Sequence, residues 1–175
     1  MYQKSVRPAE DVDRVVNMHG TMIFRICLVL LGNQHEAEDA VQETFLRFMK
    51  KAHGVNDFEY EKAWLIRTAT NICRDMKRYR IRHNHVNLDE LSEYISRESD
   101  KDLMEAIMLL PDKFKTIIHL HYMEGYKTEE IAAILKIRPE TARKRLQYAR
   151  QKLKVIMEPD HSDPLRDGKV GHIYY

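Results

Sequence analysis

Apolar residues recur every three or four positions along three stretches of the first half of the chain, which is the spacing of one helix face. These stretches predict helices over about residues 12–31, 36–52 and 60–79. Gly32-Asn33 separates the first pair and residues 53–57 separate the second, because glycine and asparagine readily adopt the left-handed conformation that ends a helix. No stretch alternates apolar and polar residues as a half-buried strand would. The first half is therefore predicted to be a helical unit.

Helical spacing weakens after the third helix and returns in the second half. Pro111 is expected to start a helix to about residue 123, Thr128 one to about Leu135, and Pro139 one to about Met157. The predicted fold class is all-α, with two small helical domains joined by a linker, the second containing a helix-turn-helix. The expected boundaries are 1–81 for the first domain, 82–100 for the linker, 101–157 for the second domain and 158–175 for a disordered tail.

Composition removes several classes of protein. Of the 175 residues 43% are hydrophobic and 32% charged, with only 6 Gly and 5 Pro, which excludes collagen-like and low-complexity chains. No uninterrupted apolar run reaches the roughly 18 residues that span a bilayer, and no signal peptide is visible. A cytoplasmic protein without direct membrane insertion is expected. Cys27 and Cys73 lie in apolar helical patterns, which indicates buried thiols and not a disulfide framework.

The net charge of +2 hides a strong segregation of charge along the chain. Basic residues dominate residues 74–82, with only Asp75 against them, and residues 138–154, with only Glu140 against them. Two basic stripes predict two contacts with a polyanion, although solvated helix faces would have the same composition.

Residues 128–146 have the form of a helix-turn-helix. Thr128 is the expected N-cap of its first helix, and Pro139 suits the first turn of the second. The apolar stripe of the second helix comprises Ala142, Leu146, Ala149 and Leu153. The opposite face carries long polar side chains suited to base edges and phosphates, namely Glu140, Arg143, Lys144, Gln147 and Gln151. Helical hairpins with basic faces also occur in proteins that never bind DNA.

The helix over residues 36–52 has an exposed face that mixes acidic and apolar groups. This face comprises Asp39, Gln42, Glu43 and Leu46. It suits a protein partner with basic groups and an apolar pocket. From the pattern alone, an ordinary solvated face with one exposed leucine is the favoured interpretation.

The helix over residues 60–79 is basic on the side opposite its buried residues, and Trp64 lies on the flank. The basic face comprises Arg67, Asn71, Arg74 and Arg78. Arginines beside aromatic rings suit single-stranded nucleic acid, because bases stack on the rings while guanidinium groups neutralise the backbone. A core role for Trp64 is the simpler alternative.

Four segments in order, residues 36–45, 64–75, 110–114 and 128–146, together resemble bacterial RNA polymerase sigma factors of the extracytoplasmic-function (ECF) group of the sigma-70 family. The resemblance covers about residues 8–155 and implies the second and fourth conserved regions of that family without the third. It implies a subunit that binds core RNA polymerase, directs it to specific promoters and assists promoter melting, with no catalysis. The implied partners are core polymerase and promoter DNA, as duplex and as melted strand. Family analogy adds an anti-sigma factor. No cofactor or metal is implied.

The resemblance also assigns roles to residues. Asp39, Gln42, Glu43 and Leu46 match core-polymerase contacts. Trp64, Arg67, Asn71, Arg74 and Arg78 match contacts to the −10 promoter element. Thr128, Arg138, Glu140, Thr141, Arg143, Lys144 and Gln147 match contacts to the −35 element. Residues 140–145 depart from the Gly-Thr-Val-Lys-Ser-Arg often found in the family, so the promoter sequence is not implied.

Two other classes of function remain to be weighed. An enzyme would need the close pairs His83/His85 or His119/His121 to converge with carboxylates or cysteines, and no such spacing exists. An autonomous helix-turn-helix regulator is the main alternative. It would bind duplex operator DNA without polymerase, often as a dimer.

Overall fold

The computed structural model of the chain describes residues 7–51, 58–82 and 98–158, and every regular element in these ranges is helical. The all-α prediction is confirmed. The first half contains α1 (Ala9–Leu31), α2 (Gln34–Lys51) and α3 (Phe58–Arg82). The second half contains α4 (Glu98–Met108), α5 (Asp112–Ile118), the π-helical turn η2 (His119–Met123), α6 (Thr128–Leu135) and α7 (Pro139–Met157). Most of the predicted linker and nearly all of the predicted tail lie outside the described residues.

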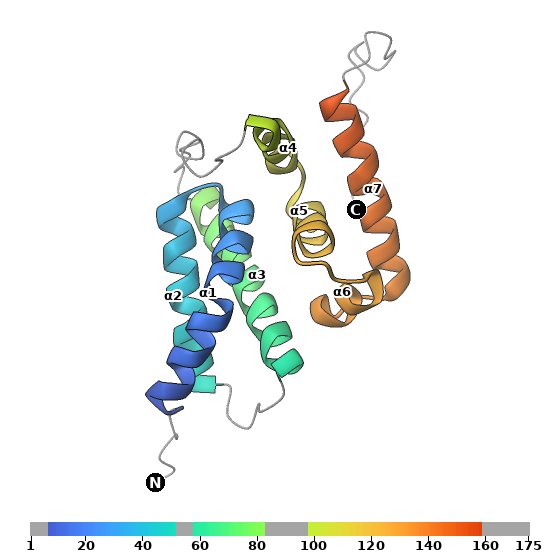
Figure 1. Cartoon of the computed structure of the whole chain (residues 1–175). Helices are drawn as coiled ribbons and strands as arrows, with labels where there is room; N and C mark the ends of the chain where they lie inside the picture. The colour runs from blue at the N-terminus through green and yellow to red at the C-terminus, as the bar shows by residue number, and fades with distance from the viewer. Residues whose placement is uncertain (1–6, 52–57, 83–97, 159–175) are drawn as a thin grey trace.

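The first half is a bundle in which α1, α2 and α3 pack side by side (Figure 1). Each helix turns one apolar face inward, and Ile23, Phe48 and Leu65 are fully buried there. Gly32 ends α1 in the left-handed conformation (φ 71°), and its N–H donates to the carbonyl oxygen of Leu28 at 2.8 Å. The Asn33 side chain then accepts the backbone N–H of Glu36 at 2.8 Å, which caps the start of α2.

The second half is built around α7, with α5 and α6 between it and the first bundle (Figure 1). The predicted stripe on α7 faces inward, since Ala142, Leu146 and Ala149 are buried and Leu153 is half-buried. Ile131 and Ala132 of α6 are also buried, so the helix-turn-helix has its expected core.

The helix predicted from Pro111 has the expected extent but changes type near its end. From His119 to Met123 the backbone is π-helical, and the N–H of Glu124 donates to the carbonyl of His119. A π-turn contains more residues than an α-turn. His119 and Leu120 in this turn are buried, as are Phe114 to Ile118 of α5 before them.

One local prediction for the helix-turn-helix is wrong. Thr128 is the first residue of α6 and not its N-cap, because Lys127 is at the cap position. The Lys127 N–H is satisfied by the Glu130 carboxylate at 2.6 Å, so the acidic side chain does the capping. In the turn, Lys136 adopts a left-handed conformation with φ 53°, where glycine is the usual residue.

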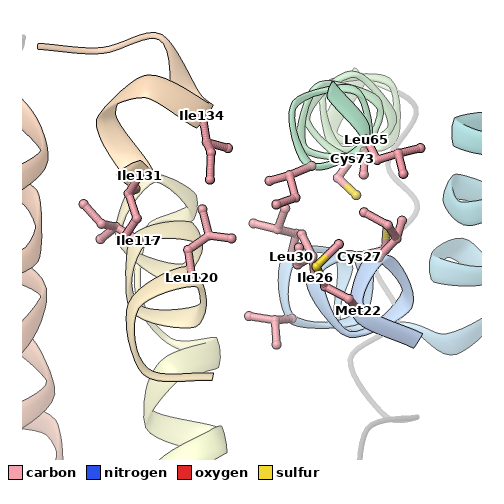
Figure 2. Close-up of a cluster of buried hydrophobic side chains, with 14 of the residues drawn as sticks. Met22, Ile26, Cys27, Leu30, Leu65, Cys73, Ile117, Leu120, Ile131 and Ile134 are labelled. Atoms are coloured by element: carbon pink, nitrogen blue, oxygen red, sulfur yellow. The ribbon is translucent and has the colours of Figure 1, made fainter. Parts of the chain in front are cut away.

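The two halves pack against each other, which the sequence did not predict. Their buried apolar residues form one cluster. Figure 2 shows Leu120 and Ile134 of the second half beside Leu30 of α1. The Lys77 ammonium of α3 lies 2.6 Å from the Asp112 carboxylate of α5, and Lys62 Nζ lies 4.7 Å from the centroid of the Tyr126 ring. The structure is thus a closed arrangement of the two halves.

By length and composition α1 could span a membrane, which a count of uninterrupted apolar residues did not indicate. Half of the qualifying stretch is buried inside the fold. A core helix meets the same criteria, and the complete burial of Val15 and Ile23 favours that interpretation.

Candidate protein and nucleic-acid interfaces

The exposed face of α2 has the composition that its periodicity predicted. Asp39 and Gln42 are exposed, and Leu46 is 45% exposed, while Thr44 and Phe48 are buried on the other side of the helix. The Glu43 carboxylate accepts a hydrogen bond from Arg47 Nε at 2.6 Å and is still accessible. The face can therefore offer a carboxylate, an amide and an isolated apolar side chain to a protein partner.

The basic face of α3 is likewise on the surface of the bundle. Asn71, Arg74 and Arg78 are exposed and Arg67 is half-buried, whereas Leu65, Ala69 and Ile72 are buried behind them. This arrangement places guanidinium groups and an amide along one side of a rigid helix. It can neutralise phosphates and hydrogen-bond an unpaired base.

The aromatic residues of α3 divide between core and surface. Trp64 is half-buried, and its ring meets Phe48 edge-on with 5.7 Å between the centroids, so part of it belongs to the core. Phe58 and Tyr60 are 45% and 51% exposed. The Arg67 guanidinium lies 5.9 Å from the Tyr60 ring centroid. Tyr60 is therefore an accessible ring at the basic face that the sequence analysis did not include among the site residues.

The outward face of α7 carries the predicted recognition residues. Glu140, Arg143, Lys144 and Gln147 are all exposed, and Thr141 is half-buried. Arg143 Nε lies 3.8 Å from the Glu129 carboxylate of α6, an exposed pair that a DNA phosphate could replace at little cost. Of the remaining candidates, Thr128 begins α6 and Arg138 is at the cap position of α7. The periodicity therefore placed this face correctly.

A groove of about 580 Å³ lies where the two halves meet. It brings Arg67, Asn71, Arg74 and Arg78 of α3 together with the turn between α6 and α7. Sequence reasoning missed the residues that approach from the second half, which are Asp112, Lys113, Thr116, Leu135, Lys136, Ile137 and Arg145. No local signal could have found them, since the basic run on α7 does not tell which of its side chains faces another domain.

Several titratable groups inside the fold lie close to one another. Both thiols are free and buried as predicted, and a hydrogen bond to Cys73 together with burial raises the pKa of Cys27. His119, whose Nε2 lies 3.3 Å from the Glu124 carboxylate, lowers the pKa of Glu124. Within the part of the chain that the structure describes, no group of three or more His, Cys, Asp or Glu residues could hold a metal ion.

Comparison with known families adds the deciding observation. The family model Sigma-70 region 2 matches residues 15–83, and the model Sigma-70, region 4 matches residues 100–153. The chain belongs to the sigma-70 family. Its curated relatives place it in the ECF group. The first match covers the helices that carry the acidic face and the basic face, and the second covers the helix-turn-helix.

Several curated relatives align along most of this sigma factor. The chain is 33% identical over 163 residues to the ECF RNA polymerase sigma factor SigE of Mycolicibacterium smegmatis, covering 86% of this chain and 63% of SigE. It is 28% identical over 178 residues to SigW of Bacillus subtilis, covering 88% and 95% of the two chains. It is 32% identical over 146 residues to SigV of the same organism, covering 78% and 85%.

Solved structures share the fold. The sigma factor RpoE of Bartonella quintana, crystallised with the anti-sigma factor NepR, matches with a TM-score of 0.70 at 22% identity, over 87% of this chain and all of that one. CnrH, in complex with the cytosolic domain of CnrY, matches with a TM-score of 0.63 at 22% identity, over 87% and 91% of the two chains. The family matches and the curated relatives confirm the sigma factor interpretation, and an autonomous regulator is not favoured. The roles of single residues stay predictions.

Proposed function

We propose that this ECF sigma factor divides promoter recognition among three helix faces. The α2 face binds core RNA polymerase, the α3 face captures the melted −10 strand, and the outward face of α7 reads the −35 duplex. The observation that carries this proposal is that all three faces are accessible on rigid helices within the two matched regions. A chain acting in this way performs no bond chemistry of its own and needs no cofactor.

Melting would proceed by capture of opened bases. Base opening is unfavourable in duplex DNA, and any group that binds only the opened strand shifts that equilibrium. Asn71 offers an amide to a flipped base, Arg74 and Arg78 can neutralise its phosphates, and Tyr60 and Trp64 offer ring surface beside them. The free energy of binding the opened base thus offsets the stacking and pairing free energy that the base loses.

Promoter binding would also require the halves to separate. In the closed arrangement the basic side of α3 faces the second half across the groove, whereas two promoter elements one to two helical turns apart lie roughly 35 to 70 Å from one another. The 15 residues from 83 to 97 can extend to roughly 50 Å. The chain length between the halves therefore permits both elements to be held together, each raising the effective concentration of the other.

An inhibitory partner belongs to the same proposal. RpoE of B. quintana forms a complex with an anti-sigma factor. The whole of RpoE matches the fold of this chain, over 87% of this chain. We propose that this chain also has an anti-sigma partner, which binds it when it is not bound at a promoter. The expected location is the cytoplasm, with the nucleoid as the site of action once polymerase is bound.

Reconstitution with core RNA polymerase tests the proposal. The purified chain is mixed with core enzyme, separated by size exclusion, and the complex is used for transcription from genomic DNA. Co-elution with transcripts that start at defined promoters is expected. Tight binding of duplex DNA by the chain alone, with no co-elution, would instead support the autonomous regulator.

A further inference from the structure

The groove between the two halves is strongly basic. Three arginines of α3 line it from one side: Arg67, Arg74 and Arg78. Three cations approach from the other half: Lys113 of α5, Lys136 of the turn and Arg145 of α7. Asp112 is the single carboxylate among its lining residues, and its charge is already matched by Lys77 at 2.6 Å. Even with Arg78 lying 3.7 Å from the Asp75 carboxylate of the same helix, the lining cations outnumber the carboxylates, so the groove carries a local excess of positive charge.

Positive charge in a groove with low-dielectric walls concentrates the field and attracts anions. Lys115 of α5 is a further cation near Lys77 and Asp112, and it is buried. Burial, reinforced by the Lys77 charge, lowers the pKa of Lys115 to about 8. The closed arrangement thus forces cations together from α3, α5 and α7, and a bound anion would relieve their repulsion.

The size and chemistry of the groove limit the ligand. A volume of about 580 Å³ lies within the roughly 300 to 1,000 Å³ typical of small-molecule sites. Guanidinium groups bind phosphate oxygens through paired hydrogen bonds, and lysine adds point charge. The Asn71 amide is a further polar group in the lining, whereas the Thr70 and Thr116 hydroxyls donate to the carbonyl oxygens of Ile66 and Asp112. Leu30, Leu135 and Ile137 add an apolar part that could cover a sugar or base.

We propose that the interdomain groove binds a small polyphosphorylated anion, either an inorganic oligophosphate or a nucleoside polyphosphate, which holds the two halves of this chain together. Because its cations come from α3, α5, the turn and α7, the site exists only in the closed arrangement. Ligand binding would therefore stabilise that arrangement by mass action. It would also occupy the α3 residues that face the groove. The site does not depend on the roles proposed above for promoter contacts.

Calorimetry on the full chain without polymerase tests this proposal. The probes are inorganic tripolyphosphate and ATP, in magnesium-free buffer at low ionic strength. One-to-one saturable binding that weakens as salt rises is expected for at least one probe. Equal affinities would identify the phosphate chain as the ligand, whereas at least tenfold tighter ATP binding would identify a nucleotide. No saturable binding of either probe up to about 1 mM would overturn the proposal.

Matched variants distinguish a built site from diffuse charge. Arg145→Ala and Lys113→Ala remove lining cations from α7 and α5, while Lys152→Ala removes an exposed cation of α7 outside the groove. We expect at least a tenfold loss of affinity for each lining variant and less than a twofold loss for Lys152→Ala, with unchanged circular dichroism. Equal losses in all three variants would overturn the proposal.

Two further measurements address the closed arrangement and the competing ligand. Small-angle scattering should show a smaller mean radius of gyration with saturating ligand, and an unchanged radius would contradict a clamp between the halves. A single-stranded oligodeoxynucleotide should compete with the polyphosphate. If the oligonucleotide binds while tripolyphosphate and ATP do not, the groove is a nucleic-acid surface and the proposal fails.

Discussion

Lys77 Nζ lies 2.6 Å from the Asp112 carboxylate and 3.0 Å from the carbonyl oxygen of Leu30. One ammonium group thus ties the last turns of α3 to the end of α1 and to the start of α5. Together with the contact of Lys62 with the Tyr126 ring, it adds polar interactions to the apolar cluster around Leu30 and Leu120.

Asp112→Asn should shift the chain toward an open arrangement. The Lys77 and Asp112 side chains are 22% and 43% exposed, so loss of this partly solvated pair should cost about 0.5 to 1 kcal/mol. That is a two- to fivefold change in the ratio of closed to open chains. Small-angle scattering should report a larger mean radius of gyration. Glu129→Gln, which removes an exposed pair within the second half, is the control and should leave the radius unchanged.

Lys115→Met should stabilise the closed fold at pH 7. The pKa of Lys115 is lowered to about 8 by burial, from 10.5 in the unfolded chain, so below pH 8 the native state must hold a buried ammonium group. Wild-type stability should rise between pH 8 and 10.5 as this group loses its proton in the native state only. Urea unfolding should show a gain of about 1 to 3 kcal/mol for the variant at pH 7 and a smaller gain at pH 9.5.

The exposed Lys113, two residues away on the same helix, supplies the control for that experiment. Lys113→Met should change the free energy of unfolding by less than about 0.5 kcal/mol. A stability difference between Lys115→Met and wild type that does not vary with pH would show that protonation is not the cause.

The double variant Gln42→Ala with Glu43→Ala should weaken binding to core RNA polymerase without loss of helix. Both residues lie on the exposed side of α2, and alanine is a good helix former. A loss of at least tenfold in affinity is expected, and Leu46→Ala should also lower the affinity. Fluorescence anisotropy with labelled chain measures the affinity for core RNA polymerase. Lys50→Ala, exposed at the end of the same helix, is the matched control, and equal effects would remove the assignment of this face.

Lys144→Ala should change −35 preference and leave core binding intact. Lys144 is exposed on the outward face of α7, where a base contact is worth about 1 to 3 kcal/mol of discrimination. Transcription from a library of −35 sequences compares the variant with Lys152→Ala, which is exposed two turns further along α7. Equal loss of transcription on every sequence would indicate a phosphate contact instead.

Lys136→Gly should stabilise the helix-turn-helix. The left-handed backbone of Lys136 (φ 53°) costs a residue with a Cβ about 1 kcal/mol, and glycine avoids most of this cost. Thermal unfolding should show a higher midpoint temperature for Lys136→Gly than for wild type, whereas Lys136→Ala should show no increase. Equal midpoints for the two variants would mean that the turn relaxes around any residue.

Much of the candidate site followed from periodicity, because helix faces are a local property. Ala37 and Phe48 had to turn inward together, so Asp39 and Gln42 had to turn outward, and they do. The same reasoning failed for the cap of α6 and for the π-turn at His119. Both depend on which neighbouring group satisfies a backbone N–H, and in these two places the local pattern allowed more than one answer.

The periodicity and motifs of the chain were sufficient to predict most helices, their buried stripes, the exposed faces and the family. Three features emerged only from the folded structure: the halves close on one another, Lys77 reaches Asp112 across 35 positions, and six cations share one groove. Apolar periodicity specifies that a face must be buried but not which surface buries it. The contact between the halves depends on complementary shape and charge from distant segments, and it exists only once both bundles have formed.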